Sequence, residues 1–92
     1  MSLRQAAAEF VALLAEAQLA GKIDGKAAEK LRKELTKLAG GKPKDREKRV
    51  EDLRERLDDE VERGRVPADF ADRLGNLIDR LEATTSGNDD ED

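Results

Sequence analysis

The side chains that could do chemistry in this chain are carboxylates, amines and guanidinium groups, because its 92 residues include no histidine and no cysteine. Without histidine there is no imidazole to act as a general base near neutral pH, and without cysteine there is no thiol nucleophile or thiolate metal ligand. Hydroxyl groups are few and lie mostly near the chain ends: Ser2, Thr36, Thr84, Thr85 and Ser86. We therefore expect that this chain is not an enzyme, that it has no catalytic residues and that it binds no cofactor.

Acidic runs at residues 51–52 and 58–60 are the groups that could hold a hard cation. Both runs fall where a helix is expected, and neighbouring side chains on a helix point in different directions. We interpret them as part of a solvated helix face on which charges offset one another: Glu51 and Glu55 against Arg54 and Arg56. No metal site is expected.

The net charge of −4 comes from the acidic residues 89–92, since the rest of the chain is neutral overall. This acidic run lacks the spaced glycine and glutamate of a calcium-binding loop. We expect residues 84–92 to form a disordered tail, because no apolar side chain anchors them. A neutral body argues against a broad electrostatic surface for nucleic acid or anionic lipid.

A local excess of positive charge occurs at residues 42–49, which hold five basic and two acidic side chains. Lys42, Lys44 and Arg46 could contact an anionic surface there, such as a phosphate-rich polymer or lipid headgroups. However, no aromatic side chain is interleaved to stack on bases. The segment is therefore predicted to be a solvated connection between helices, and nucleic-acid binding is disfavoured.

Gly75 and Asn76 are unusual choices for the interior of a helix, where glycine costs about 1 kcal/mol relative to alanine. One interpretation is that these two residues are neutral substitutions at an exposed position of the helix. The other is that Gly75 lets a second helix approach closely, for example from another subunit. Together with Lys42, Lys44 and Arg46, these two residues are the candidate interaction surface.

An internal repeat determines the expected architecture. Residues 21–38 align without gaps on residues 64–81, at an offset of 43, so that Gly21 falls on Gly64. The register continues upstream, where Phe10 falls on Leu53. Two copies of one helix-turn-helix unit are therefore predicted.

Each copy is predicted to hold two amphipathic helices, because apolar residues recur at spacings of three and four and strand-forming residues are scarce. Four helices are expected: the first between Leu3 and Ala20, the second between Asp24 and Gly40–Gly41, the third between Asp45 and Gly64, and the fourth between Pro67 and Ala83. The expected core positions are Leu3, Ala7, Phe10, Leu14, Ala17, Ile23, Ala27, Ala28, Leu31, Leu35, Leu38, Val50, Leu53, Leu57, Val61, Val66, Phe70, Ala71, Leu74, Leu77, Ile78 and Leu81.

The predicted fold class is all-α, with two antiparallel helical hairpins packed as a small four-helix bundle over residues 1–83. The repeats span residues 3–39 and 45–83, and the acidic tail spans residues 84–92. The alternative is an elongated pair of hairpins that completes its core by dimerising. Because folding a chain this short leaves a thin core, we expect no cavity of several hundred Å³ and hence no small-molecule substrate.

The pattern of glycine turns and leucine stripes resembles the helical region beyond the kinase domain of actinobacterial serine/threonine protein kinases. The residues that carry the resemblance are Gly21, Ile23, Asp24, Ala27, Ala28, Leu31, Leu35, Val50, Leu53, Leu57, Gly64, Val66, Pro67, Leu74, Leu77 and Leu81. The resemblance implies a non-catalytic, extracytoplasmic module tethered by a membrane span outside this chain. The sequence departs from the family's pattern at Asp24-Gly25, where Asp-Pro is expected.

The function expected from the sequence is a non-enzymatic sensory or protein-interaction module of a larger signalling protein. It would act by self-association or by binding a protein partner. The alternative is a structural or adaptor domain in the cytosol, and a third is a nucleic-acid-associated helical protein. The location follows the same division, extracytoplasmic if the resemblance holds and cytoplasmic otherwise.

Overall fold

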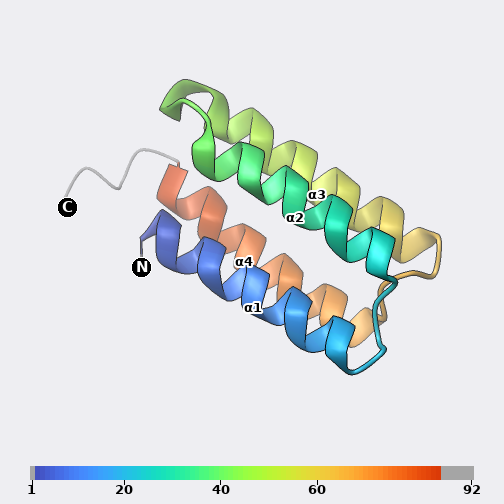
Figure 1. Ribbon diagram of the computed structural model, residues 1–92. Coiled ribbons are helices and arrows are strands. Elements are labelled where there is room, and N and C mark those ends of the chain that lie inside the picture. The colour runs from blue at the N-terminus through green and yellow to red at the C-terminus, as the bar shows by residue number, and fades with distance from the viewer. Residues whose placement is uncertain (1, 86–92) are drawn as a thin grey trace.

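The computed structural model describes residues 2–85, which form four α-helices and one short 3-10 turn (Figure 1). Helix α1 spans Leu3–Leu19, α2 spans Gly25–Gly40, α3 spans Arg46–Glu62 and α4 spans Ala68–Thr85, with the 3-10 turn η1 at Pro43–Asp45. No strand occurs within this described range, so the predicted all-α class is confirmed.

The helices pack as a four-helix bundle in which chain neighbours run antiparallel (Figure 1). Helices α1 and α3 each contact both α2 and α4, so the four helices enclose one core. The α1–α2 and α3–α4 turns lie together at one end, while the α2–α3 connection lies at the other end with the start of α1 and the end of α4 (Figure 1). The two hairpins therefore cover each other's apolar stripes within a single chain, as the first of the two predicted architectures requires.

The two hairpin turns share one geometry, which supports the repeat. Gly21 and Gly64 have φ values of +71° and +77°, a left-handed conformation that glycine adopts without a Cβ clash. In both turns the residue after the glycine donates its N–H to a carbonyl five residues back: Lys22 to Ala17 at 2.9 Å, and Arg65 to Glu60 at 3.0 Å. These are the bonds of a Schellman motif, which satisfies the last carbonyls of α1 and α3.

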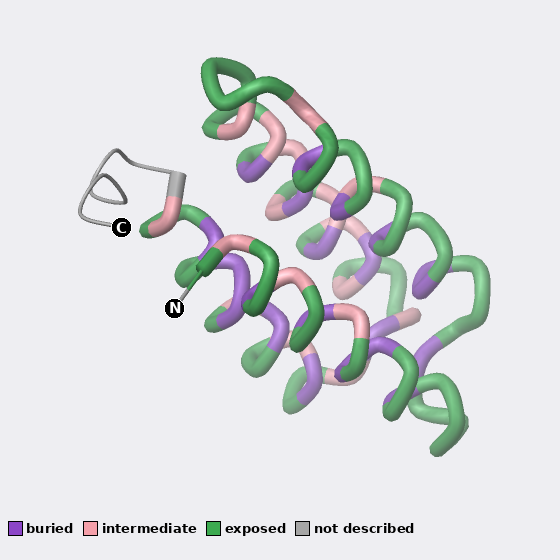
Figure 2. The backbone as a smooth tube through the Cα atoms, turned by 60° about the vertical axis from the view of Figure 1, so that its left-hand side comes forward, coloured by how far each residue is buried: buried purple, intermediate pink, exposed green. Residues whose placement is uncertain are grey.

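The core runs the length of the bundle along the inner side of every helix (Figure 2). Most of the predicted stripe is buried, but Ala6 and Leu13 are buried as well and were not predicted. The physical reason is that α1 packs against two helices and therefore buries a wider band than one row of three–four spacing. The predicted core positions that are only half-buried are Leu3, Ala7, Val61 and Ala71.

Helix boundaries follow the predicted caps with two differences. Asp24 caps α2 as expected, its carboxylate accepting from the N–H groups of Lys26 and Ala27 at 3.0 and 3.2 Å. Asp45 precedes α3 but its side chain accepts no capping bond, because Asp45 is the last residue of the η1 turn and already has helical backbone angles. An unpredicted cap is Ser2, whose hydroxyl oxygen accepts from Gln5 N–H at the start of α1.

The predicted end of the helical domain at residue 83 was two residues too early, because α4 continues to Thr85. The threonines stay in the helix, and the Thr84 hydroxyl donates to the Leu81 carbonyl at 2.8 Å. The rest of the predicted acidic tail, residues 86–92, lies outside the described residues.

Gly75→Ala is expected to raise the free energy of unfolding by about 0.5–1 kcal/mol, because glycine costs that much in a helix interior. A Cβ built at Gly75 meets no other atom within 4 Å, so the added methyl group finds open space. Urea denaturation measures the change. An unchanged or lower stability would contradict the open environment and would support the close helix approach that the sequence suggested.

Candidate interaction surface

The side chains of α1 and α4 line an open groove of about 390 Å³ on the outside of the bundle. We define the α1–α4 face as this groove together with Leu19. Its residues are Glu9, Ala12, Leu13, Glu16 and Leu19 of α1 and Arg73, Asn76, Leu77 and Arg80 of α4. This hollow is an open surface groove rather than an enclosed cavity, so it does not test the expectation that the core holds no cavity of several hundred Å³.

Two ion pairs cross the groove and show which residues of α1 and α4 lie side by side. Arg80 Nη1 lies 3.4 Å from Glu9 Oε1, and Arg73 Nη1 lies 3.9 Å from Glu16 Oε2. All four side chains are about half exposed, so each pair contributes little to stability. The two pairs are seven residues apart on each helix, a separation of about 10 Å along the axis.

The space between these ion pairs is uncharged. The antiparallel register that joins Glu9 to Arg80 and Glu16 to Arg73 puts Ala12 level with Leu77, and Leu13 level with Asn76. The leucines form the floor, since they are only 7% and 8% exposed. The face therefore has an uncharged centre between the two ion pairs, with Ala12 and Asn76 at the surface and the two leucines buried beneath them.

Leu19 extends the apolar character to the turn end of this face. The Leu19 side chain is 90% exposed, and no other large apolar side chain among the described residues is exposed. It continues the α1 row Glu9, Ala12, Glu16, whose spacings of three and four keep all four residues on one stripe. The same register places it level with Phe70, over whose ring the guanidinium of Arg73 lies at 5.3 Å from the centroid.

The opposite face of the bundle, formed by α2 and α3, shows how unusual this centre is. At the repeat offset of 43, positions of the α1–α4 face align with positions of the α2–α3 face. The acidic residues of α1 align with acidic residues of α3, and the arginines of α4 align with lysines of α2. At the centre, however, the repeat replaces every uncharged residue by a charged one: Ala12 by Glu55, Leu13 by Arg56, Asn76 by Lys33 and Leu77 by Glu34. The two faces therefore differ most at the centre, where the α1–α4 face is uncharged and the α2–α3 face is charged.

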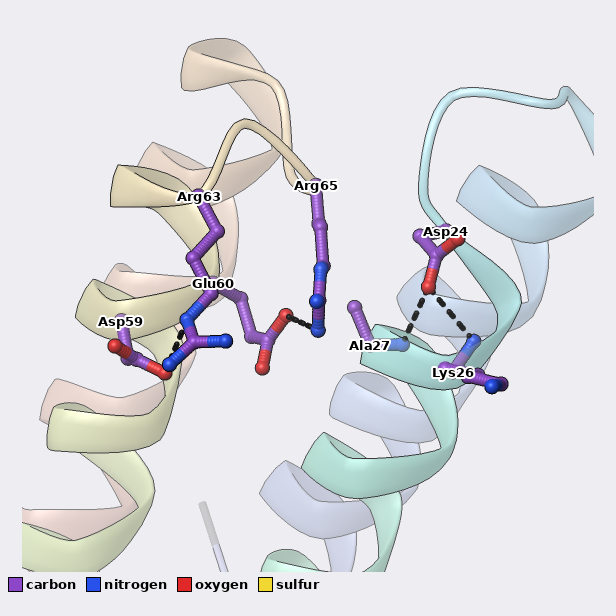
Figure 3. Close-up of polar contacts among 7 residues, drawn as sticks. All are labelled: Asp24, Lys26, Ala27, Asp59, Glu60, Arg63 and Arg65. Atoms are coloured by element: carbon purple, nitrogen blue, oxygen red, sulfur yellow. Dashed lines mark hydrogen bonds and ion pairs between the residues drawn. The ribbon is translucent and has the colours of Figure 1, made fainter.

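A buried carboxylate lies at the turn end of the bundle. Glu60 of α3 is fully buried, and its Oε1 accepts from Arg65 Nη1 at 3.2 Å, while Oε2 has no hydrogen-bond partner (Figure 3). This corrects the sequence-based interpretation, which placed all of residues 58–60 on a solvated face. Glu60 occupies the position that Ala17 holds in the first repeat.

Arg65 joins this carboxylate to the neighbouring hairpin. Its backbone N–H donates to the Glu60 carbonyl within the turn, and its own carbonyl accepts from Asp24 N–H at 3.1 Å. Figure 3 shows its side chain running from the α3–α4 turn toward Glu60, beside the start of α2. The matching bond from the second turn cannot form, since Pro67 has no N–H. We assign a structural role to the pair, which holds the Arg65 side chain against the end of α3, while the Arg65 carbonyl links the two turns.

The five residues proposed from the sequence do not form one surface. Asn76 lines the groove, but Gly75 lies one turn from Asp79, whose carboxylate pairs with Arg54 of α3, and so it lies on the α3 side of α4. Lys42, Lys44 and Arg46 lie at the α2–α3 connection, where the lysines are exposed and Arg46 is half-buried. Sequence reasoning missed Ala12, Leu13 and Leu19, although the repeat comparison with Glu55 and Arg56 was available.

Within residues 2–85, no cluster of acidic side chains has an arrangement that could hold a metal ion. Over the same part of the chain, no helix has both the length and the apolar composition needed to cross a membrane.

Comparison of the chain with protein families, with curated proteins and with solved structures found no match.

Proposed function

We propose that this chain is a protein-interaction domain and that the α1–α4 face is its contact surface. The observation that carries the proposal is the contrast between the two faces. At equivalent positions of the repeat, the α2–α3 face is charged throughout, whereas the α1–α4 face is uncharged at its centre and carries an exposed Leu19. A centre depleted of charged side chains inside a polar rim is typical of contact surfaces between proteins.

The resemblance to the helical region of actinobacterial kinases extends this proposal. If the chain is such a region, contacts made by the α1–α4 face would bring attached catalytic domains together or recruit a partner to them. A structural or adaptor role in the cytosol would use the same face. Gene context, meaning a kinase domain and a membrane span encoded upstream, distinguishes these two settings.

Photo-crosslinking tests the proposed surface. A photoreactive phenylalanine analogue introduced at Asn76 is expected to form a covalent protein adduct in the native host. The matched control is the same analogue at Lys33, which is the repeat equivalent of Asn76 on the α2–α3 face and is also exposed. Mass spectrometry then identifies whether the captured protein is a second copy of this chain or another protein.

An adduct formed at position 76 in clear excess over position 33 supports the proposal, whichever protein is captured. Equal capture at both positions, or capture at neither, contradicts it, because the two faces would then behave alike. Circular dichroism of both variants checks that the helical fold is kept.

A further inference from the structure

Building on the proposed contact surface, we infer that the α1–α4 face binds a second copy of this chain, with α1 of each copy against α4 of the other. The two copies would be related by a twofold axis that runs parallel to the bundle axis and passes between the two faces. Such an interface is isologous, so the same residues contribute from both copies. The observation that favours this partner is that the face is complementary to itself.

The crossed ion pairs provide the charge complementarity. A twofold axis parallel to the helices keeps every residue at its own height and exchanges the two sides of the face. Because Glu9 and Arg80 lie at one height, Glu9 of one copy would face Arg80 of the other. Each ion pair would thus meet its copy in reversed order, giving four charges of alternating sign.

The same rotation about the axis matches the Glu16–Arg73 pair with its own copy. The other simple arrangement, with the axis perpendicular to the helices, would put α1 against α1 and α4 against α4. It would bring acids toward acids and arginines toward arginines, which is unfavourable. Charge therefore selects the parallel axis.

Apolar groups coincide in the same arrangement. Ala12 would lie against Leu77 of the second copy, since the groove register places these two residues at one height. By the same register, Leu19 would lie level with Phe70 of the second copy, whose ring is buried beneath Arg73, and the second copy would shield Leu19 from water. The docking thus covers the exposed large apolar side chain on this face.

The size of the face indicates which class of interface to expect. Two helices of about 17 residues present a strip about 26 Å long and 20 Å wide, or about 500 Å² per copy. The total of about 1,000 Å² is at the lower limit for specific interfaces, so we expect a weak, reversible dimer.

Sedimentation and light scattering of the whole purified chain test this inference, over concentrations from about 10 μM to 1 mM, a range in which weak protein dimers form. The mass is expected to rise from the monomer's 10.2 kDa toward twice that value. Ala12→Glu, which installs the residue that the repeat has at Glu55, is expected to weaken the dimer at least about tenfold by placing a carboxylate in the uncharged centre. The matched control, Glu55→Ala on the opposite face, is expected to leave the dissociation constant unchanged.

A monomer at every concentration would overturn self-association, and so would a dimer that Ala12→Glu does not weaken. Crosslinking at position 76 separates this failure from that of the proposed function. If that position captures a different protein while the purified chain stays monomeric, the contact surface stands and only its partner was wrong. If neither experiment detects a contact, both proposals fail.

Discussion

Arg65→Ala is expected to lower the free energy of unfolding by about 3 kcal/mol, because it leaves a buried carboxylate without its charged partner. Glu60 is fully buried, whereas the Arg65 side chain is 33% exposed. The partial exposure places the cost at the lower end of the range for broken buried pairs. Urea denaturation followed by circular dichroism measures the loss.

A double-mutant cycle shows whether the cost comes from the pair. Glu60→Ala restores the residue of the first repeat, Ala17, and removes the carboxylate, so the cost of Arg65→Ala in that background is expected to fall below about 1 kcal/mol. An equal cost in both backgrounds would show that Arg65 acts through its backbone bonds and turn geometry alone. The double variant also keeps the test open if Arg65→Ala by itself does not fold.

Phe10→Ala is expected to cost about 3–5 kcal/mol, since it removes a fully buried aromatic ring from the centre of α1. In a domain of this size, such a loss is a large part of the total stability. Thermal and urea denaturation both report it, and the helical circular dichroism signal at low denaturant shows how much folded protein remains.

Phe10→Leu is the matched control, because leucine is the residue at the equivalent position, Leu53, of the second repeat. A substitution that keeps most of the apolar volume is expected to cost less than about 1.5 kcal/mol. If Phe10→Leu were as damaging as Phe10→Ala, the ring itself would be required in this core. If both were harmless, Phe10 would not pack as described.

Local sequence signals predicted the helices and turns well, because short-range physics determines them. Gly21 and Gly64 were predicted as helix ends, and both adopt the left-handed conformation that only glycine accepts easily. Asp24 was predicted to cap α2 and does so through two backbone N–H groups. The repeat then implied that the second hairpin would resemble the first.

The features that the sequence did not predict depend on which helices become neighbours. Leu13 and Leu19 appear on the same helix as the core stripe, and only the position of α4 shows that one lines a groove and the other remains exposed. Glu60 was assigned to solvent because it is acidic and follows two other acids. The repeat contained the contrary signal, since Glu60 aligns with Ala17, a predicted core position.

The two faces of the bundle divide the molecule in a way that the repeat alone would not suggest. The α2–α3 face keeps its charged centre, which favours contact with water. The α1–α4 face has the same acid and base rows but an uncharged centre. The proposed contact surface therefore rests on a difference at equivalent positions of the two copies, rather than on the charge of either copy.

Disulfide trapping between two single-cysteine variants tests the pairing of α1 with α4 most directly, since the natural chain contains no cysteine to interfere. Ala12→Cys and Asn76→Cys are purified separately, mixed and oxidised gently. We expect a covalent dimer that contains one copy of each variant, in clear excess over the dimers that either variant forms alone. If Ala12→Cys instead links mainly to itself, or if the mixture links no more than Lys33→Cys controls do, the proposed pairing is wrong.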